Sequence, residues 1–471
     1  MQIPDLNGRG RPCLHGEAGA DLNRQNMRMQ RFAKQIRGIR MLSELRKLRS
    51  SGAIRRYCRR LREIQTSQKA AECEERMKAF LILEDGTVFE GTHIGADKEI
   101  ISEIVFNTSM AGYLEVLTDP SYAGQAVCMT YPLIGNYGIC RDDCESERPW
   151  PDGFIVRELS RIPSNFRCDC TIQEYLEENG VPGIAGIDTR ALTKILREKG
   201  TMNGMITTNE AYDLSEVLPK LKEYTTGKVV EKVTCREKYV VAPTTDLVQN
   251  GPLSGAARFD KEAYEKGVRE PKPALVTELS GQGLKVALLD LGAKKNIARS
   301  LAERGCEVTV YPAGTPAQEI IDDNPDGIML SNGPGDPKEC TGVIAEIKKL
   351  YDTEIPIFAI CLGHQLMALA TGADTHKMKY GHRGGNHPVK DLMTGRVYIS
   401  SQNHGYVVDT DKLDPSVAVP AFINVNDGTN EGLSYTGKNI FTVQFHPEAC
   451  PGPQDSGYLF DRFIHMMRGE N

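Results

Sequence analysis

In the second half of the chain, short apolar runs alternate with amphipathic stretches, and this alternation limits the possible folds strongly. The pattern predicts buried strands over residues 285–290, 307–311, 327–331 and 355–360, and a helix over 294–304. Strands that alternate with helices form a mainly parallel sheet with helices on both faces. We therefore predict an α/β fold with a doubly wound sheet. Its active site is expected beyond the carboxyl ends of the strands.

A cysteine stands at one of these strand ends. The apolar run before it stops abruptly at Cys361-Leu-Gly-His-Gln365, which predicts a sharp turn into a helix and an exposed nucleophile. His446 and Glu448 follow 85 residues later as His-Pro-Glu. A cysteine attacks as the thiolate and needs a base, which His446 can supply while Glu448 fixes its tautomer. A lone cysteine after a strand is usually a buried hydrophobic residue, but the set together favours acyl transfer through a thioester.

A glycine-rich loop, Ser331-Asn-Gly-Pro-Gly-Asp-Pro337, follows the preceding predicted strand. The backbone N–H groups of Gly333 and Leu362 are candidate oxyanion-hole donors, because glycine lets the backbone approach a substrate closely. An ordinary tight turn is the alternative interpretation of the loop. A phosphate-binding loop is disfavoured, since no Gly-Lys-Ser/Thr follows.

Composition bounds the class of protein. With 471 residues, the chain needs two or three domains, and 40% hydrophobic and 25% charged residues are typical of soluble globular proteins. No apolar run approaches the roughly 20 residues that span a bilayer, and the first fifteen residues lack a signal-peptide core. The 13 cysteines are odd in number and scattered, which indicates a reducing cytoplasm.

Four cysteines lie close in sequence, at Cys140, Cys144, Cys168 and Cys170. Their spacing fits no common Cys-x2-Cys zinc pair, so we expect loop or core thiols rather than a metal site.

Residues 1–76 form a basic leader. They carry 18 Lys and Arg against 8 Asp and Glu, whereas the whole chain has a net charge of −6. Apolar residues recur at helical spacing from Ile36 to Ile64, which indicates a basic amphipathic helix that could bind nucleic acid, anionic lipid or a partner, or act as a transit sequence. We favour a misplaced start codon, with Met77 as the first residue of the natural protein.

The domain boundaries follow from local patterns. Residues 77–228 form a first domain, which opens with a strand, an Asp-Gly hairpin turn and a second strand. Its helices are predicted over 171–179 and 189–199. Residues 229–283 are polar and rich in Pro and Gly, which indicates a linker with a short helix near 261–266. Residues 284–471 form the second domain.

Cys361-Leu-Gly-His-Gln365 together with His446-Pro-Glu448 resembles the class I, triad-type glutamine amidotransferases, which release ammonia from glutamine. Further motifs across residues 77–471 are similar to the small subunit of carbamoyl-phosphate synthase. The motifs that carry this resemblance are Phe106–Tyr113, Leu117–Tyr122, Tyr131–Gly138, Ile187–Leu192, Lys377–Pro388 and Ser401–Tyr406.

The resemblance implies a small-subunit amino-terminal α/β domain followed by a class I glutaminase domain. It implies that Cys361 is the nucleophile, His446 the general base and acid, and Glu448 the orienting carboxylate. The implied glutamine contacts are Ser109, Gly333, Gly335, Leu362, Gln365, Asn403, Gly405 and Tyr406.

The resemblance also implies a hetero-oligomer with a large subunit that combines the ammonia with bicarbonate and ATP-derived phosphate into carbamoyl phosphate, for arginine or pyrimidine biosynthesis. ATP, Mg²⁺ and bicarbonate would then be used by that partner. We expect no metal or cofactor in this chain, no nucleic acid on its core, no membrane association and a cytoplasmic location.

Three features depart from the family pattern: Ala359 where the family often has glycine, a longer interdomain segment near 246–279, and the leader. We expect the turn at Cys361 still to close, because alanine is small. The alternative functions are an amidotransferase for guanylate or anthranilate synthesis, which residues 77–228 disfavour, and a non-catalytic paralogue, which the intact triad disfavours.

Overall fold

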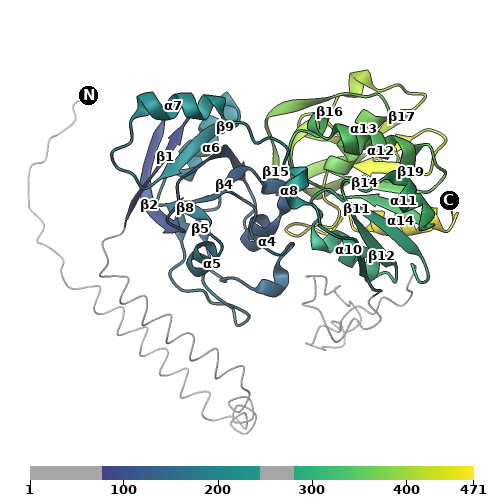
Figure 1. Cartoon of the computed structure of the whole chain (residues 1–471), viewed down its shortest axis with the longest axis horizontal. Coiled ribbons are helices and arrows are strands. Elements are labelled where there is room, and N and C mark those ends of the chain that lie inside the picture. The colour runs from purple at the N-terminus through teal and green to yellow at the C-terminus, as the bar shows by residue number, and fades with distance from the viewer. Residues whose placement is uncertain (1–76, 244–280, 471) are drawn as a thin grey trace, which may run out of the picture. The chain divides into compact units, whose positions relative to one another are not determined.

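The structure, a computed structural model, describes residues 77–243 and 281–470 (Figure 1). The predictions for the basic leader, for its start codon and for the short helix near 261–266 lie outside the described residues. Within them, no helix is long and apolar enough to cross a membrane.

The amino-terminal domain is built around a closed β-barrel. Its strands are β1 (Lys78–Leu83), β2 (Val88–Gly95), β3 (Ile100–Asn107), β4 (Gln125–Met129), β6 (Gly153–Val156), β8 (Pro182–Ala185) and β9 (Met202–Thr207). They follow the order β1-β2-β8-β6-β4-β3-β9, and β9 pairs back with β1. The predicted hairpin is confirmed: β1 and β2 are antiparallel around Asp85 and Gly86, and Gly86 has the positive φ of 84° that such a turn requires.

Helices and short strands complete this domain. They are α4 (Tyr113–Thr118), η1 (Pro120–Tyr122), η2 (Arg141–Asp143), α5 (Ile172–Glu178), α6 (Thr189–Lys199), α7 (Leu214–Glu223), β5 (Leu133–Ile134) and β7 (Glu158–Leu159). Helix α6 has its predicted bounds: the Asp188 side chain accepts from two N–H groups of the first turn, and Gly200 ends the helix at φ 104°. Such an N-cap contributes about 1 kcal/mol.

The carboxyl-terminal domain holds a ten-stranded sheet. In spatial order the strands are β10 (Tyr239–Val241), β12 (Glu307–Pro312), β11 (Lys285–Asp290), β13 (Gly327–Leu330), β14 (Ile357–Ile360), β19 (Ile440–Val443), β18 (Asn430–Tyr435), β17 (Ala418–Asn424), β15 (Thr375–Asp391) and β16 (Val397–Val408). The central strands β12, β11, β13, β14 and β19 are parallel, and antiparallel strands extend both sides. The doubly wound sheet is therefore confirmed.

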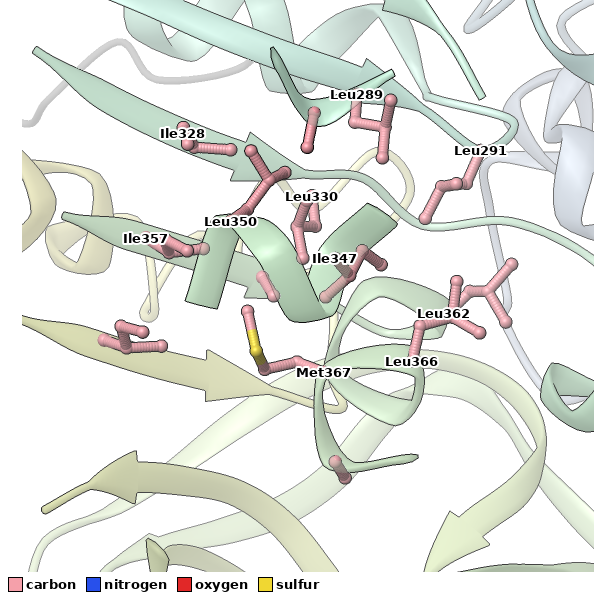
Figure 2. Close-up of a cluster of buried hydrophobic side chains, with 14 of the residues drawn as sticks. Leu289, Leu291, Ile328, Leu330, Ile347, Leu350, Ile357, Leu362, Leu366 and Met367 are labelled. Atoms are coloured by element: carbon pink, nitrogen blue, oxygen red, sulfur yellow. The ribbon is translucent and has the colours of Figure 1, made fainter. Parts of the chain in front are cut away.

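Both faces of this sheet are covered by apolar cores, because neighbouring residues of a strand point to opposite faces. Leu289 and Leu330 pack with helices α12 (Thr341–Tyr351) and α13 (Leu362–Ala370), as Figure 2 shows. Leu288 and Met329 pack on the other side, in the core that includes α10 (Lys295–Ala302) and α14 (Tyr458–Met467). The remaining helices are α8 (Val230–Val233), α11 (Ala317–Asp322), η3 (Pro337–Glu339) and η4 (Thr410–Lys412).

The stretch predicted as a linker from residue 229 contains two ordered elements. Helix α8 buries Val230 and Val233, and strand β10 pairs antiparallel with β12. The linker prediction missed both, because the polar residues around these short elements hide the few buried apolar positions.

Candidate active site

Cys361 occupies a strained turn between strand β14 and helix α13. Its φ of 52° and ψ of −103° are unusual for a residue with a side chain, and such strain is concentrated at functional sites. The turn is held by hydrogen bonds from Cys361 N to Val443 O (2.8 Å) and from Gly363 N to Ser331 O (3.0 Å). A Cβ on Gly363 would lie 2.6 Å from Leu330 O, so only glycine fits there. The elbow forms with Ala359 fully buried before it.

His446 and Glu448 follow strand β19, which is the neighbour of β14 in the sheet. Nδ1 of His446 lies 2.7 Å from Oε1 of Glu448, and both side chains are buried. Nε2 of His446 has no hydrogen-bond partner among the described residues. The pair therefore has the form of an oriented base, with one nitrogen held by the carboxylate and the other available for a proton.

The charges around His446 favour its protonated form. Burial and Lys294 would lower the pKa of His446, but the Glu448 carboxylate and the Cys361 thiol outweigh them and raise it to about 9. Burial would raise the pKa of Glu448, yet Lys294 and His446 lower it to about 2. A protonated His446 beside Cys361 is the setting in which a thiolate is stabilised.

Lys294, which was not predicted from the sequence, contacts the Glu448 carboxylate of this pair. Its side chain is buried, and its Nζ lies 2.7 Å from Oε1 of Glu448 and 3.1 Å from the Ala449 carbonyl oxygen. The sequence carries no local signal for this contact, because the lysine and the carboxylate are separated by more than 150 residues.

Cys361 opens onto a cleft of about 300 Å³. Six of the eight predicted glutamine contacts line this cleft: Gly333, Gly335, Gln365, Asn403, Gly405 and Tyr406. Gln365 faces it from one turn after Cys361, and its amide donates to Tyr406 O (2.8 Å) and to Gln444 Oε1 (2.9 Å). A cleft of this size suits a small polar substrate.

Ser109 and Leu362 are not among the residues that line the cleft. Ser109 is buried, and its N–H is held by Asn107 Oδ1 at 2.7 Å. The Leu362 side chain belongs to the apolar core, so this residue can serve the site only through its backbone. Within the described residues the N–H groups of Leu362 and Gly333 have no hydrogen-bond partner.

The amino-terminal domain reaches this site through polar side chains that the sequence did not reveal. Asp119 Oδ2 accepts from the Asn403 amide at 3.0 Å, and Ser121 Oγ accepts from Asn332 at 2.9 Å. Glu145 accepts from the N–H of Asn296 in helix α10 at 3.0 Å. The first contact fixes Asn403, which lines the cleft, and the other two join the amino-terminal domain to the residues Asn332 and Asn296.

The four cysteines at 140, 144, 168 and 170 remain thiols. In the described part of the chain they belong to no group of three potential metal ligands.

Comparison with known proteins places this geometry in a class. Residues 287–466 match the family model for class-I glutamine amidotransferases, so the carboxyl-terminal domain is of that class. Residues 81–206 match the model for the carbamoyl-phosphate synthase small chain, CPSase domain.

Relatives extend the match over both domains. The carbamoyl phosphate synthase small chain of Clostridium perfringens is 49% identical over 82% of this chain and 99% of its own length. The same protein of Fusobacterium nucleatum is 48% identical over 82% of this chain and 96% of its length, and that of Bacillus caldolyticus 47% over 84% and 98%. The chain belongs to the family of carbamoyl phosphate synthase small chains.

Proposed function

We propose that this chain hydrolyses L-glutamine to glutamate and ammonia at Cys361, as the glutaminase subunit of a carbamoyl-phosphate synthase. The observation that carries the proposal is the placement of Cys361 on a strained elbow, at a 300 Å³ cleft, beside the buried His446–Glu448 pair. The family membership supports the same substrate.

The reaction follows from the roles of the side chains. The Cys361 thiolate attacks the side-chain amide carbon of glutamine, and the free N–H groups of Leu362 and Gly333 stabilise the oxyanion. His446 gives its proton to the leaving ammonia, and a thioester remains on Cys361. His446 then takes a proton from water, the resulting hydroxide attacks the thioester, and glutamate is released while the thiolate is restored. Glu448 stabilises the imidazolium throughout.

Substrate contacts follow from the lining of the cleft. We assign Gly333, Gly335, Gln365, Asn403, Gly405 and Tyr406 to the amino-acid part of glutamine, which needs both donors and acceptors. Leu362 contributes its N–H. The buried Ser109 remains an expected contact from the resemblance, without support from the lining of the cleft.

The ammonia is passed to a large subunit, which uses ATP, Mg²⁺ and bicarbonate to make carbamoyl phosphate in the cytoplasm. Support for this partner comes from the amino-terminal domain, which matches the small chain of that synthase. Amidotransferases for guanylate or anthranilate synthesis lack this domain, and the intact triad argues against a non-catalytic paralogue.

The test is glutamate release from glutamine, measured for the purified chain alone and with the large subunit added. We expect glutamate release that rises in the presence of the large subunit, and trapping of a γ-glutamyl hydroxamate when hydroxylamine is added. Glutamate release without a hydroxylamine-trapped product would contradict the thioester, and no release in either mixture would contradict the proposed activity.

A further inference from the structure

A second group of reactive side chains lies on the antiparallel side of the sheet. His382 on β15, His404 on β16 and Glu431 on β18 each offer one ligand atom, and these atoms lie within 4.8 Å of one another. All three residues are buried, with Glu431 at 0% exposure. Strand pairing sets His382 directly opposite His404, so the position of the group follows from the register of the sheet.

One nitrogen of each imidazole is held by a carboxylate or by a backbone carbonyl oxygen. Nε2 of His382 lies 2.8 Å from the Asp427 carboxylate, and Nδ1 lies 3.5 Å from Oε1 of Glu431. Nδ1 of His404 donates to the Tyr406 carbonyl oxygen at 2.8 Å, and Nε2 lies 2.6 Å from Oε1 of Gln402. Metal-binding histidines are oriented in this way, by a carboxylate or a backbone carbonyl on the far nitrogen.

The group contains an unsatisfied buried oxygen. Asn424 donates to Oε1 of Glu431 at 2.8 Å, whereas Oε2 of Glu431 has no hydrogen-bond partner among the described residues. Leaving a buried charged oxygen unpaired is unfavourable for the folded state. A cation bound at this oxygen would remove that cost.

A second unfavourable contact joins the His404 ring to the Gln402 side chain. In the neutral ring Nε2 carries a lone pair, yet the Gln402 side-chain oxygen lies 2.6 Å away, so two acceptors face each other. A rotated Gln402 amide would satisfy Nε2 of His404, but it would leave the Glu431 oxygen unpaired. A cation bound by Nε2 of His404 and Oε2 of Glu431 would satisfy both atoms once the Gln402 side chain moves away from Nε2.

We propose that His382, His404 and Glu431 bind one divalent transition-metal cation, for which Zn²⁺ is the expected ion. Two imidazole nitrogens and one carboxylate oxygen suit Zn²⁺. Its two charges balance the carboxylates of Glu431 and Asp427. This departs from the expectation, drawn from the sequence, that the chain binds no metal.

The cation acts on the glutamine cleft through the backbone of β16. His404 stands between Asn403 and Gly405, and these residues line the cleft together with Tyr406. Fixing His404 to β15 and β18 therefore holds the strand that supplies the predicted substrate contacts. The role is positioning, separate from the chemistry at Cys361.

The test is metal binding by the full chain in a Cys361→Ser background, which removes the nucleophilic thiol as a competing ligand. After equilibrium dialysis against micromolar Zn²⁺, elemental analysis should give about one zinc per chain. With Co²⁺ as the probe, visible d–d absorption should appear without thiolate-to-cobalt charge transfer in the near ultraviolet, because the ligands are nitrogen and oxygen.

Glu431→Gln should weaken binding of Zn²⁺ at least about 100-fold, since losing a direct ligand exceeds the 10–100-fold cost of losing an outer partner. The matched control is Glu90→Gln, at an exposed carboxylate of β2 that should leave binding unchanged. Zinc content that is equal in both variants overturns the proposal. If Glu431→Gln fails to fold, the parent protein decides: no bound zinc, or a cobalt spectrum with thiolate charge transfer, also overturns it.

Discussion

The two domains contribute to the candidate site in different ways. The amino-terminal barrel is closed, so its strands leave no open edge, and it contributes to the site with side chains of its strands, such as Glu103 and Gln125, and of its connections, such as Asp119 and Ser121. The carboxyl-terminal sheet is open, and the ends of β14 and β19 lead directly into Cys361 and His446. The reactive groups thus come from parallel strand ends, while the barrel orients residues around them. Substitutions in the carboxyl-terminal sheet should therefore mainly lower kcat, whereas substitutions in the amino-terminal domain should have smaller effects, mainly on KM or on stability.

The largest loss is expected when the base is removed from the open sheet. His446→Ala should lower kcat for glutamine hydrolysis by at least about 10⁴-fold, because a triad acts as a unit. Steady-state glutamate release measures the effect. His465→Ala, at an exposed histidine of α14, is the matched control and should keep normal activity. A loss of less than tenfold in His446→Ala would remove this residue from the mechanism.

A smaller loss is expected from the orienting carboxylate. Glu448→Gln should lower kcat about 10²-fold, less than removal of the base, because the amide can still hold the ring while the imidazolium loses its negative partner. The same assay measures it. An unchanged kcat would mean that the 2.7 Å contact does not serve catalysis.

The same variant should change how stability depends on pH. The folded pKa of His446, about 9, lies above the value near 6.5 for an unfolded histidine. Its contribution to stability is therefore complete below about pH 6.5 and is lost as pH rises through about 9. In Glu448→Gln the pKa of His446 should fall and this loss should move to lower pH. Denaturant midpoints between pH 6 and about 9.5 measure it, and identical profiles would contradict the assignment.

A change in the barrel should affect substrate binding more than chemistry. In Asp119→Asn the one remaining side-chain oxygen accepts from the N–H of Ser121, so an NH2 group faces the Asn403 amide and Asn403 loses its orientation. We expect KM for glutamine to rise about tenfold, equivalent to about 1.4 kcal/mol, with kcat within about threefold. Asp213→Asn, at the exposed N-cap of α7, is the control. A fall in kcat without a change in KM would show that Asp119 takes part in the reaction at Cys361. The amino-terminal domain would then contribute to catalysis and not only to substrate binding.

The smallest effect is expected far from the cleft. Thr171 caps helix α5 in a capping box with Glu174, so Thr171→Ala should lower the free energy of unfolding by about 1 kcal/mol and leave kcat and KM unchanged. Chemical denaturation measures the loss. Thr208→Ala, which removes only one long hydrogen bond of 3.4 Å, should be nearly neutral. A change in kcat for Thr171→Ala would show that the stability of the amino-terminal domain also affects the reaction at Cys361.

The features predicted best from the sequence are those that depend on residues close together in the chain. Strand β11 and helix α6 have the predicted bounds, because their apolar periodicity and caps lie within a few residues of each other. The elbow at Cys361 was predicted for the same reason. Closure of the barrel, the buried Lys294 and the Asp119–Asn403 contact were not, since each depends on residues far apart in the chain. Ser109 was carried over from the family, and the cleft does not include it.

We propose that Cys361 supplies ammonia to a separate active site. The most direct measurement is carbamoyl-phosphate synthesis by Cys361→Ser assembled with the large subunit, with glutamine or with ammonium as the nitrogen source. We expect that synthesis from glutamine is abolished and that synthesis from ammonium stays near the level of the unmodified complex. Glutamine-dependent synthesis that persists in Cys361→Ser would contradict it.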